Sequence, residues 1–259
     1  MRIAVMSDIH GNLEAFVQSL NDARRLKVDG IVNLGDGIGY GPQPEEVLNL
    51  LEKKDILNIL GNHELAVLDK NLREYFSPQA LLSLEQTLKY LTVASMRYLK
   101  SLPAYLDLEG TLLVHGYPPD SPTDYLNRMS FSEIEETFTL NGFDIAFVGH
   151  THHMMLIGYD GKDLQFDPLK QEIIQLDSKY RYIVNVGAVG QPRDGDPRAK
   201  YVIWDSDRKT LQIRRVYYNV GRVTALIGQR GFLQRDAKRL IAGDTPDKCE
   251  LFQLASRNR

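Results

Sequence analysis

The chain has one cysteine among its 259 residues, and this scarcity excludes several classes of protein. Cys249 cannot form a disulfide within the chain, and a lone thiolate cannot build a cysteine-rich zinc site. We therefore expect a reducing compartment, the cytoplasm. The first apolar run begins almost at Met1, so we expect no signal peptide.

Long hydrophobic runs and a charge excess are also missing. No apolar run approaches the ~18–20 residues that span a bilayer, so we expect no membrane segment. The net charge is −3 and is spread along the chain, which argues against bulk nucleic acid as a partner. With 43% hydrophobic and 25% charged residues, the composition is that of a soluble globular protein. We expect a single domain over residues 1–259.

Short apolar runs alternate with helical patterns in the first half. This alternation indicates a parallel sheet covered by helices on both faces. The expected strands and helices are, in order, strand 1–6, helix 13–26, strand 31–34, helix 44–54 and strand 56–60. Residues 65–102 interrupt this alternation of strands and helices. Their apolar residues recur at helical spacing, which predicts a helical insertion of two helices.

From residue 104 onward the pattern is mostly of strands, with one helix near the middle. The expected strands are 105–108, 111–114, 145–148, 154–159, 164–167, 173–175, 182–186, 200–205 and 211–216, and the helix is 130–141. Residues 222–243 predict a C-terminal tail of two short helices, ended by Gly231 and Gly243.

Several predicted strands stop at side chains that can bind a metal ion. The carboxyl ends of strands in an α/β sheet are where ligands bind, so these side chains should meet. Any one of them alone occurs by chance in many proteins, but their joint occurrence after five strands does not. They are Asp8 and His10, Asp36, Asn62 and His63, His115, and His150 and His152.

Oxygen and imidazole ligands without thiolates suit borderline ions such as Mn, Fe, Zn, Co or Ni. There are too many candidates for one ion, and about enough for two. Two ions ~3.5–4 Å apart need an anionic bridge to offset their repulsion, and a carboxylate supplies it. We expect Asp36 to be that bridge.

These residues carry a resemblance to a known family. The chain resembles the calcineurin-like metallophosphoesterases in five motifs, which occur in the family's order between Met1 and about Tyr218. The resemblance implies an α/β fold, a four-layer α/β/β/α sandwich of two mixed sheets flanked by helices. The motifs are Asp8-Ile9-His10, Gly35-Asp36, Gly61-Asn62-His63-Glu64, His115 and Gly149-His150-Thr151-His152.

The resemblance also implies a role for each residue. His63 is then not a ligand but the general acid that protonates the leaving oxygen, and Glu64 either orients His63 or is simply an acid at a helix N-terminus. His153 is not expected to be a ligand. The first ion would be held by Asp8, His10, Asp36 and His152, and the second by Asp36, Asn62, His115 and His150.

The sequence departs from one branch of the family in its second motif, which indicates the branch that it resembles more. The Ser/Thr protein phosphatases continue the second motif with an Asp-Arg pair, where this chain has Gly39 and Tyr40. The clamping arginine is missing, which favours the compact bacterial and archaeal phosphodiesterases that residues 37–42 and 187–198 resemble. In the later loop Arg193 is either a phosphate clamp or a surface arginine paired with a neighbouring aspartate. Asn12 and Tyr40 are further candidate substrate contacts.

We thus expect a metal-dependent phosphoesterase, in the first place a phosphodiesterase, that uses a hydroxide activated by two metal ions and His63 as general acid. The ions expected first are Mn or Fe, with Zn, Ni, Co and Mg as alternatives. The expected substrate is nucleotide-like or another small diester. A small-molecule or protein phosphomonoesterase, a non-catalytic metal-binding scaffold and a nuclease are the rival hypotheses. Sequence leaves the substrate, the native metal and the oligomeric state open.

Overall fold

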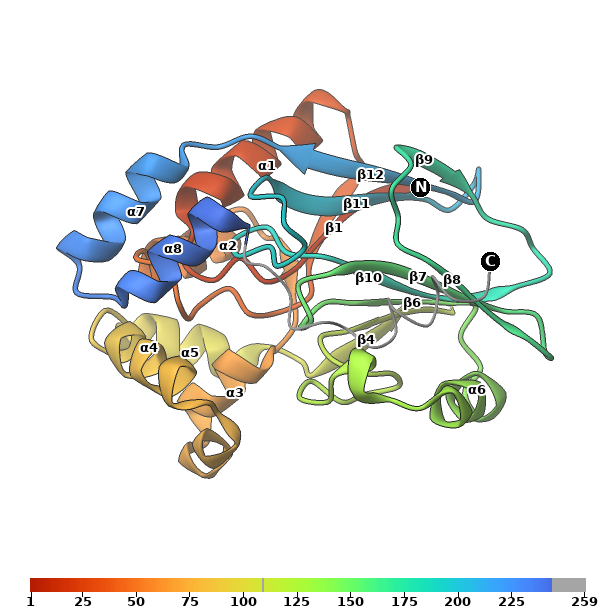
Figure 1. Ribbon diagram of the computed structural model, residues 1–259, viewed down its shortest axis with the longest axis horizontal. Coiled ribbons are helices and arrows are strands. Elements are labelled where there is room, and N and C mark those ends of the chain that lie inside the picture. The colour runs from red at the N-terminus through yellow and green to blue at the C-terminus, as the bar shows by residue number, and fades with distance from the viewer. Residues whose placement is uncertain (109, 244–259) are drawn as a thin grey trace.

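The computed structural model describes residues 1–108 and 110–243, in which two six-stranded mixed sheets pack face to face (Figure 1). The first sheet has the order β3 (Leu57–Asn58), β2 (Gly30–Asn33), β1 (Arg2–Met6), β11 (Ala199–Asp205), β12 (Thr210–Val216) and β9 (Ile173–Gln175). The second has the order β4 (Tyr105–Leu108), β5 (Thr111–Val114), β6 (Ile145–Val148), β10 (Arg181–Val186), β7 (Met154–Tyr159) and β8 (Leu164–Asp167).

Each sheet has a parallel part that matters for the site. Strands β1, β2 and β3 run parallel in the first sheet, and β5, β6 and β10 run parallel in the second. The remaining pairings are antiparallel, including β1 with β11 and β10 with β7. The carboxyl ends of six parallel strands, three in each sheet, therefore carry loops that can form a ligand-binding site.

Successive side chains of a strand point to opposite faces of its sheet, so each strand contributes to two layers of the core. In β1, Ile3 and Val5 enter the core between the sheets, while Ala4 and Met6 face the outer helices. On that outer face lie α1 (Leu13–Arg25) and α2 (Pro44–Lys53), whereas α6 (Phe131–Leu140) covers the outer face of the second sheet through Phe138. The result is the expected four-layer α/β/β/α sandwich.

The 65–102 segment contains α4 (Pro78–Leu88) and α5 (Val93–Ser101), which are two helices as expected. Ser77 and Thr92 begin them, because each side chain accepts a hydrogen bond from the backbone three residues on. Two elements were not expected from sequence: α3 (Asn62–Leu68) starts at the motif itself, and a 3₁₀ helix, η1 (Lys70–Tyr75), follows it.

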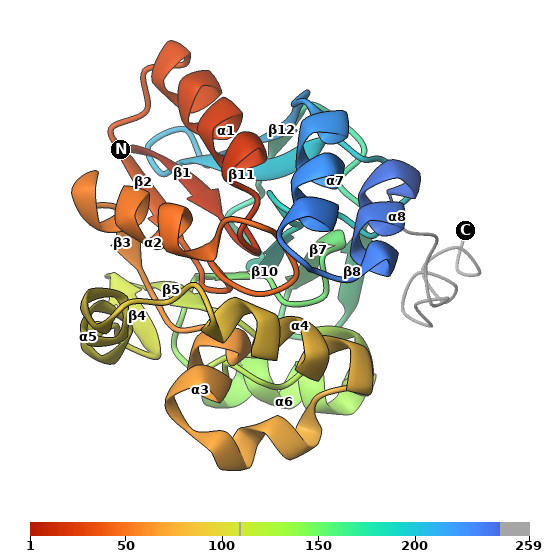
Figure 2. The same cartoon turned by 90° about the vertical axis from the view of Figure 1, so that its left-hand side faces the viewer.

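The tail forms α7 (Val220–Gln229) and α8 (Gln234–Ala242), and α8 ends at Gly243, whose φ of 66° is left-handed. Figure 2 shows this pair beside α4 at one end of the sandwich. The link between the two helices is held there, since Gln86 donates to the carbonyl of Arg230 at 2.5 Å. Cys249 lies outside the described residues. None of the described helices is long and apolar enough to span a membrane.

Candidate metal centre

The predicted ligand residues meet where the parallel strands of both sheets end. Two sheets, rather than one, supply them, and all but the half-buried Asn62 are at most 3% exposed. Asp8 and His10 follow β1, Asp36 follows β2, Asn62 and His63 begin α3 after β3, His115 follows β5, and His150 and His152 follow β6.

The backbone of these loops is held in an uncommon conformation. Asp8, His10, Asp36, His150 and His152 all have φ between 48° and 65°. For residues other than glycine this left-handed region costs about 1 kcal/mol or more each, so surrounding contacts must hold them there. One such contact joins the sheets: the amide of His150 donates to Asp8 Oδ2 at 3.0 Å.

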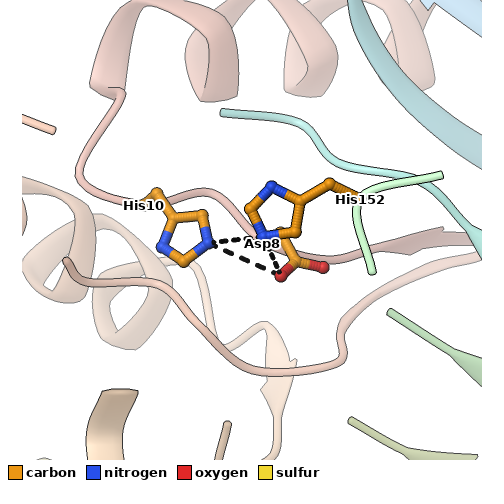
Figure 3. Close-up of side chains that lie close together, drawn as sticks. All are labelled: Asp8, His10 and His152. Atoms are coloured by element: carbon orange, nitrogen blue, oxygen red, sulfur yellow. Dashed lines mark hydrogen bonds and ion pairs between the residues drawn. The ribbon is translucent and has the colours of Figure 1, made fainter. Parts of the chain in front are cut away.

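The first group of ligands gathers around Asp8 (Figure 3). His152 Nε2 lies 3.1 Å from Asp8 Oδ1, and His10 Nε2 lies 3.5 Å from the same oxygen. The two imidazole nitrogens are 3.1 Å apart, and His10 Nε2 is 3.7 Å from Asp36 Oδ2. We call Asp8, His10 and His152 the first half-site.

The second group lies on the other side of Asp36. His115 Nε2 is 3.3 Å from Asp36 Oδ2 and 3.3 Å from Asn62 Oδ1. A ring nitrogen of His150 lies within 4.8 Å of ligand atoms of Asp36 and His115. We call Asn62, His115 and His150 the second half-site. Asp36 thus contacts both half-sites.

Backbone carbonyls fix the tautomer of the four histidines. A carbonyl only accepts, so the ring nitrogen that faces it carries a hydrogen, and the other nitrogen is the one that faces the site. The contacts are His10 Nδ1 to Ile38 O at 2.9 Å, His115 Nδ1 to Leu34 O at 2.8 Å, His150 Nε2 to Thr123 O at 3.1 Å, and His152 Nδ1 to Gln191 O.

Such a cluster of acceptors fits a divalent cation. Asp8 Oδ1 is buried and accepts no hydrogen bond from any described residue, although two histidine nitrogens face it. Ligands at right angles, about 2.1 Å from one ion, lie about 3 Å apart, close to the spacing seen here. Carboxylate, amide and imidazole ligands are the set that borderline divalent metals take. Without a cation these lone pairs would repel one another.

Charge differs between the two half-sites. Burial opposes a charged His115, but the carboxylate of Asp36 outweighs it and raises the pKa of His115 to about 9. Burial lowers the pKa of His152 to about 3, and the charge of Arg193 adds to this. Burial would raise the pKa of Asp36, yet His115 and His63 hold it far below its ordinary range. Asp36 is therefore ionised.

His63 lies beside the half-sites, with Nε2 4.0 Å from Asp36 Oδ2. Its Nδ1 is buried and has no hydrogen-bond partner among the described residues. Gly39 packs against it so closely that a Cβ there would lie 2.3 Å from Nδ1. Glu64 does not orient His63, because its oxygens accept from the backbone amides of Asp36, Ile38 and Gly61. The carboxyl of Glu64 instead ties the Asp36 loop to the start of α3.

The comparisons with known proteins agree with this geometry. A family model described as calcineurin-like phosphoesterase matches residues 1–154, more than half of the chain. The chain belongs to the calcineurin-like phosphoesterase family. An uncharacterized protein from Methanocaldococcus jannaschii is 32% identical over 244 residues, which cover 90% of this chain and 98% of that protein.

Solved structures of similar proteins support the same assignment. A metallophosphoesterase from Sphaerobacter thermophilus has a TM-score of 0.80 and 34% identity, and the match covers 94% of this chain and 99% of that one. A hypothetical protein from Pyrococcus horikoshii has a TM-score of 0.75 at 19% identity, covering 95% and 99% of the two chains, and shows the shared fold.

The three residues predicted to contact substrate differ in their surroundings near the candidate metal centre. The ring of Tyr40 packs beside His10 and His63, 4.8 Å from each, and the guanidinium of Arg193 lies 5.8 Å from the ring centre. Asn12 is 1% exposed; its Oδ1 accepts from Ala15 N and its Nδ2 donates to Gly190 O. Both polar atoms of Asn12 are thus used within the protein.

Arg193 does not pair with either neighbouring aspartate. Asp194 pairs with the buried Lys200 at 2.8 Å, and Asp196 pairs with Arg198 at 2.6 Å. Arg193 donates to Gln191 Oε1 at 3.2 Å, and its buried Nε has no partner among the described residues. Its charge is therefore not neutralised by Asp194 or Asp196, and it acts on the site, where it helps to lower the pKa of His152.

Sequence reasoning missed two aromatic neighbours of the site. Phe76, after η1, lies 4.9 Å from the ring of His63, and Tyr125, in the loop after β5, packs against His150 with ring centres 3.7 Å apart and a tilt of 30°. Both lie in loops without apolar periodicity, so no pattern marked them. Their spacing from the metal-binding motifs carried no signal either.

Proposed function

We propose that this chain is a metal-dependent phosphoesterase that hydrolyses phosphodiesters. The observation that carries the proposal is Asp36, whose carboxylate contacts His10 on one side and His115 on the other. That arrangement is suited to two divalent ions sharing one carboxylate, with Mn or Fe as the first candidates. The first half-site and Asp36 would hold one ion, and the second half-site and Asp36 the other.

Divalent ions at these positions would lower the pKa of a water molecule and offset charge on the phosphoryl oxygens. The protein's own contribution begins with Arg193, whose guanidinium can bind two phosphate oxygens at once. Its loop is held in place because the ammonium group of Lys200, 1% exposed, pairs with Asp194 and donates to the carbonyl of Asp196. Arg193 is thus fixed beside the site before substrate binds.

We propose that His63 protonates the departing oxygen. In the free site burial lowers the pKa of His63 to about 3, with the charge of Asp36 opposing this, so the ring is neutral. The negative charge of a bound phosphoester favours the protonated ring, since an opposite charge raises the pKa of a histidine. Nδ1 has no carboxylate partner, so the substrate itself supplies the charge that lets His63 hold a proton.

We base the phosphodiester preference on the number of arginines beside the ions. Arg193, next to Tyr40, is the arginine that the proposed reaction uses at the ions, and Tyr40 itself occupies the position of the protein-phosphatase arginine. A diester carries one negative charge, whereas a monoester carries close to two at pH 7. One arginine beside the ions suits the diester.

The test is hydrolysis of bis-p-nitrophenyl phosphate beside p-nitrophenyl phosphate. Metal-stripped protein, the same protein resupplied with Mn²⁺, and Asp36→Asn would be compared. Diester cleavage that needs both the metal and Asp36 is the expected result. Cleavage of the monoester alone would favour a phosphomonoesterase. Two bound ions with no turnover of either ester would favour the non-catalytic scaffold.

A further inference from the structure

Two arginine–tyrosine pairs flank the metal centre, and the proposed reaction uses one of them. Arg193 lies over Tyr40, which contacts His10. On the other side, the guanidinium of Arg128 lies 4.5 Å from the ring centre of Tyr125, and that ring packs against His150 at a tilt of 30°. The second arrangement therefore places a guanidinium one aromatic ring away from a metal-site histidine.

The loop that carries the second pair is fixed by several contacts. Leu126 is 2% exposed and begins the short 3₁₀ helix η2 (Leu126–Arg128), whose end is closed by the amide of Arg128 donating to Tyr125 O at 2.9 Å. The carbonyl of Thr123 faces His150 Nε2. Tyr125 is thus held against His150 from the same loop that fixes the tautomer of that histidine.

The guanidinium of Arg128 is available to bind an anionic ligand. None of the ion pairs among the described residues includes Arg128, and the nearby Asp124 accepts from Ser121 at 2.8 Å. A guanidinium placed over an aromatic ring can still donate hydrogen bonds through its N–H groups. Arg128 itself is exposed, so the edge is accessible. A planar donor of this kind matches phosphate oxygens.

We propose that Arg128, positioned by Tyr125, forms a second anion subsite beside the metal centre, and that the preferred phosphoesters carry a second phosphate group. This inference rests on the proposed function for the first phosphate, which would lie at the ions and Arg193. The second phosphate would lie beyond Tyr125, at the edge of Arg128. A nucleoside bisphosphate, in which a sugar separates two phosphates, is the simplest probe of this class.

The experiment compares adenosine 3′,5′-bisphosphate with adenosine 5′-monophosphate, which differ by one phosphate. Their dissociation constants would be measured by calorimetry on protein loaded with Mn²⁺. The bisphosphate should bind about tenfold more tightly to the wild type, the usual worth of one charge-assisted contact. Arg128→Gln should reduce that ratio to about twofold or less, and Tyr125→Leu should also reduce it, because the guanidinium loses its support.

A matched control removes the same charge elsewhere. Arg97 is exposed on α5, and Arg97→Gln should keep the wild-type ratio. The subsite is overturned if the wild type binds both nucleotides equally or binds neither, or if Arg128→Gln keeps the wild-type ratio. Failure of the proposed function gives a different result: metal-dependent diester cleavage is absent while the nucleotide ratio and its dependence on Arg128 remain.

Discussion

The two half-sites share Asp36 but differ in charge. In the second, His115 lies 3.3 Å from the Asp36 carboxylate and its pKa is raised to about 9, so the metal-free ring carries a proton. In the first, burial lowers the pKa of His152 to about 3, so that ring is neutral beside the ionised Asp8. In the metal-free protein a proton on His115 thus takes the place of a cation in the second half-site. In the first half-site the lone pairs of the ligands face one another.

This difference shows how the buried charges of the site are compensated in the metal-free protein. His115 neutralises Asp36 inside a buried cluster, which makes the second half-site tolerable in the metal-free protein. The first half-site has no such compensation, because Asp8 Oδ1 accepts no hydrogen bond from the described residues. We infer that metal binding relieves more repulsion in the first half-site and displaces a proton from the second.

The largest effect is expected where the half-sites meet. Asp36→Asn should lower kcat/KM for the diester by more than about 10,000-fold, because an amide cannot bridge two cations. His150→Ala should remove one ligand from the second half-site alone and leave the ion of the first half-site in place. Metal analysis of both purified variants checks this; an Asp36→Asn protein with one ion at full occupancy would break the comparison. Circular dichroism controls for folding.

The sequence made much of this arrangement predictable, because short apolar runs that stop at a ligand residue mark buried strands and their carboxyl ends. The strand limits were less certain: β3 spans Leu57–Asn58, where 56–60 was expected. The four carbonyl partners of the histidines could not be foreseen, since they belong to backbone brought together by folding. Tyr125 and Phe76 lie in irregular loops, where no periodicity signals a contact.

His63 belongs to neither half-site, and its removal separates chemistry from metal binding. His63→Ala should keep both ions and lower kcat by about 100- to 10,000-fold, the usual worth of a general acid. His153→Ala is the matched control, a neighbouring histidine that is not a proposed ligand, and it should keep wild-type turnover. Loss of metal from His63→Ala, with full activity per loaded molecule, would instead make His63 a ligand.

The pH dependence of metal binding should distinguish the half-sites. The pKa of His115 is raised to about 9 from an ordinary 6.5, so its pairing with Asp36 stabilises the metal-free protein fully below pH 6.5 and is lost as pH rises through 9. An ion must displace that proton, so affinity at the second half-site should rise about tenfold per pH unit between 7 and 8.

Calorimetry of metal-stripped protein in buffers of different ionisation enthalpy would count the proton released. His115→Asn provides the control, since that variant has no imidazole to protonate. Affinity of the second half-site that is flat between pH 7 and 8 would contradict the charge difference between the half-sites.

The smallest effect is expected at Asn12, next to the first half-site. Its side chain caps α1 and bonds to Gly190, so we propose a structural role in place of the substrate contact expected from sequence. Asn12→Ala should lower the free energy of unfolding by about 1–2 kcal/mol and leave KM for the diester within about twofold, a change of under ~0.5 kcal/mol in binding. Thermal unfolding and steady-state kinetics measure the two; a large rise in KM would restore the substrate role.

The most direct test of the account is the number of ions that the wild-type chain binds. Metal-stripped protein titrated with Mn²⁺ should take up two ions per chain, one of them with proton release, and Asp36→Asn should weaken both together. Uptake of a single ion by the wild type, or an Asp36→Asn variant that retains one site at unchanged affinity, would contradict a centre in which Asp36 joins the two half-sites.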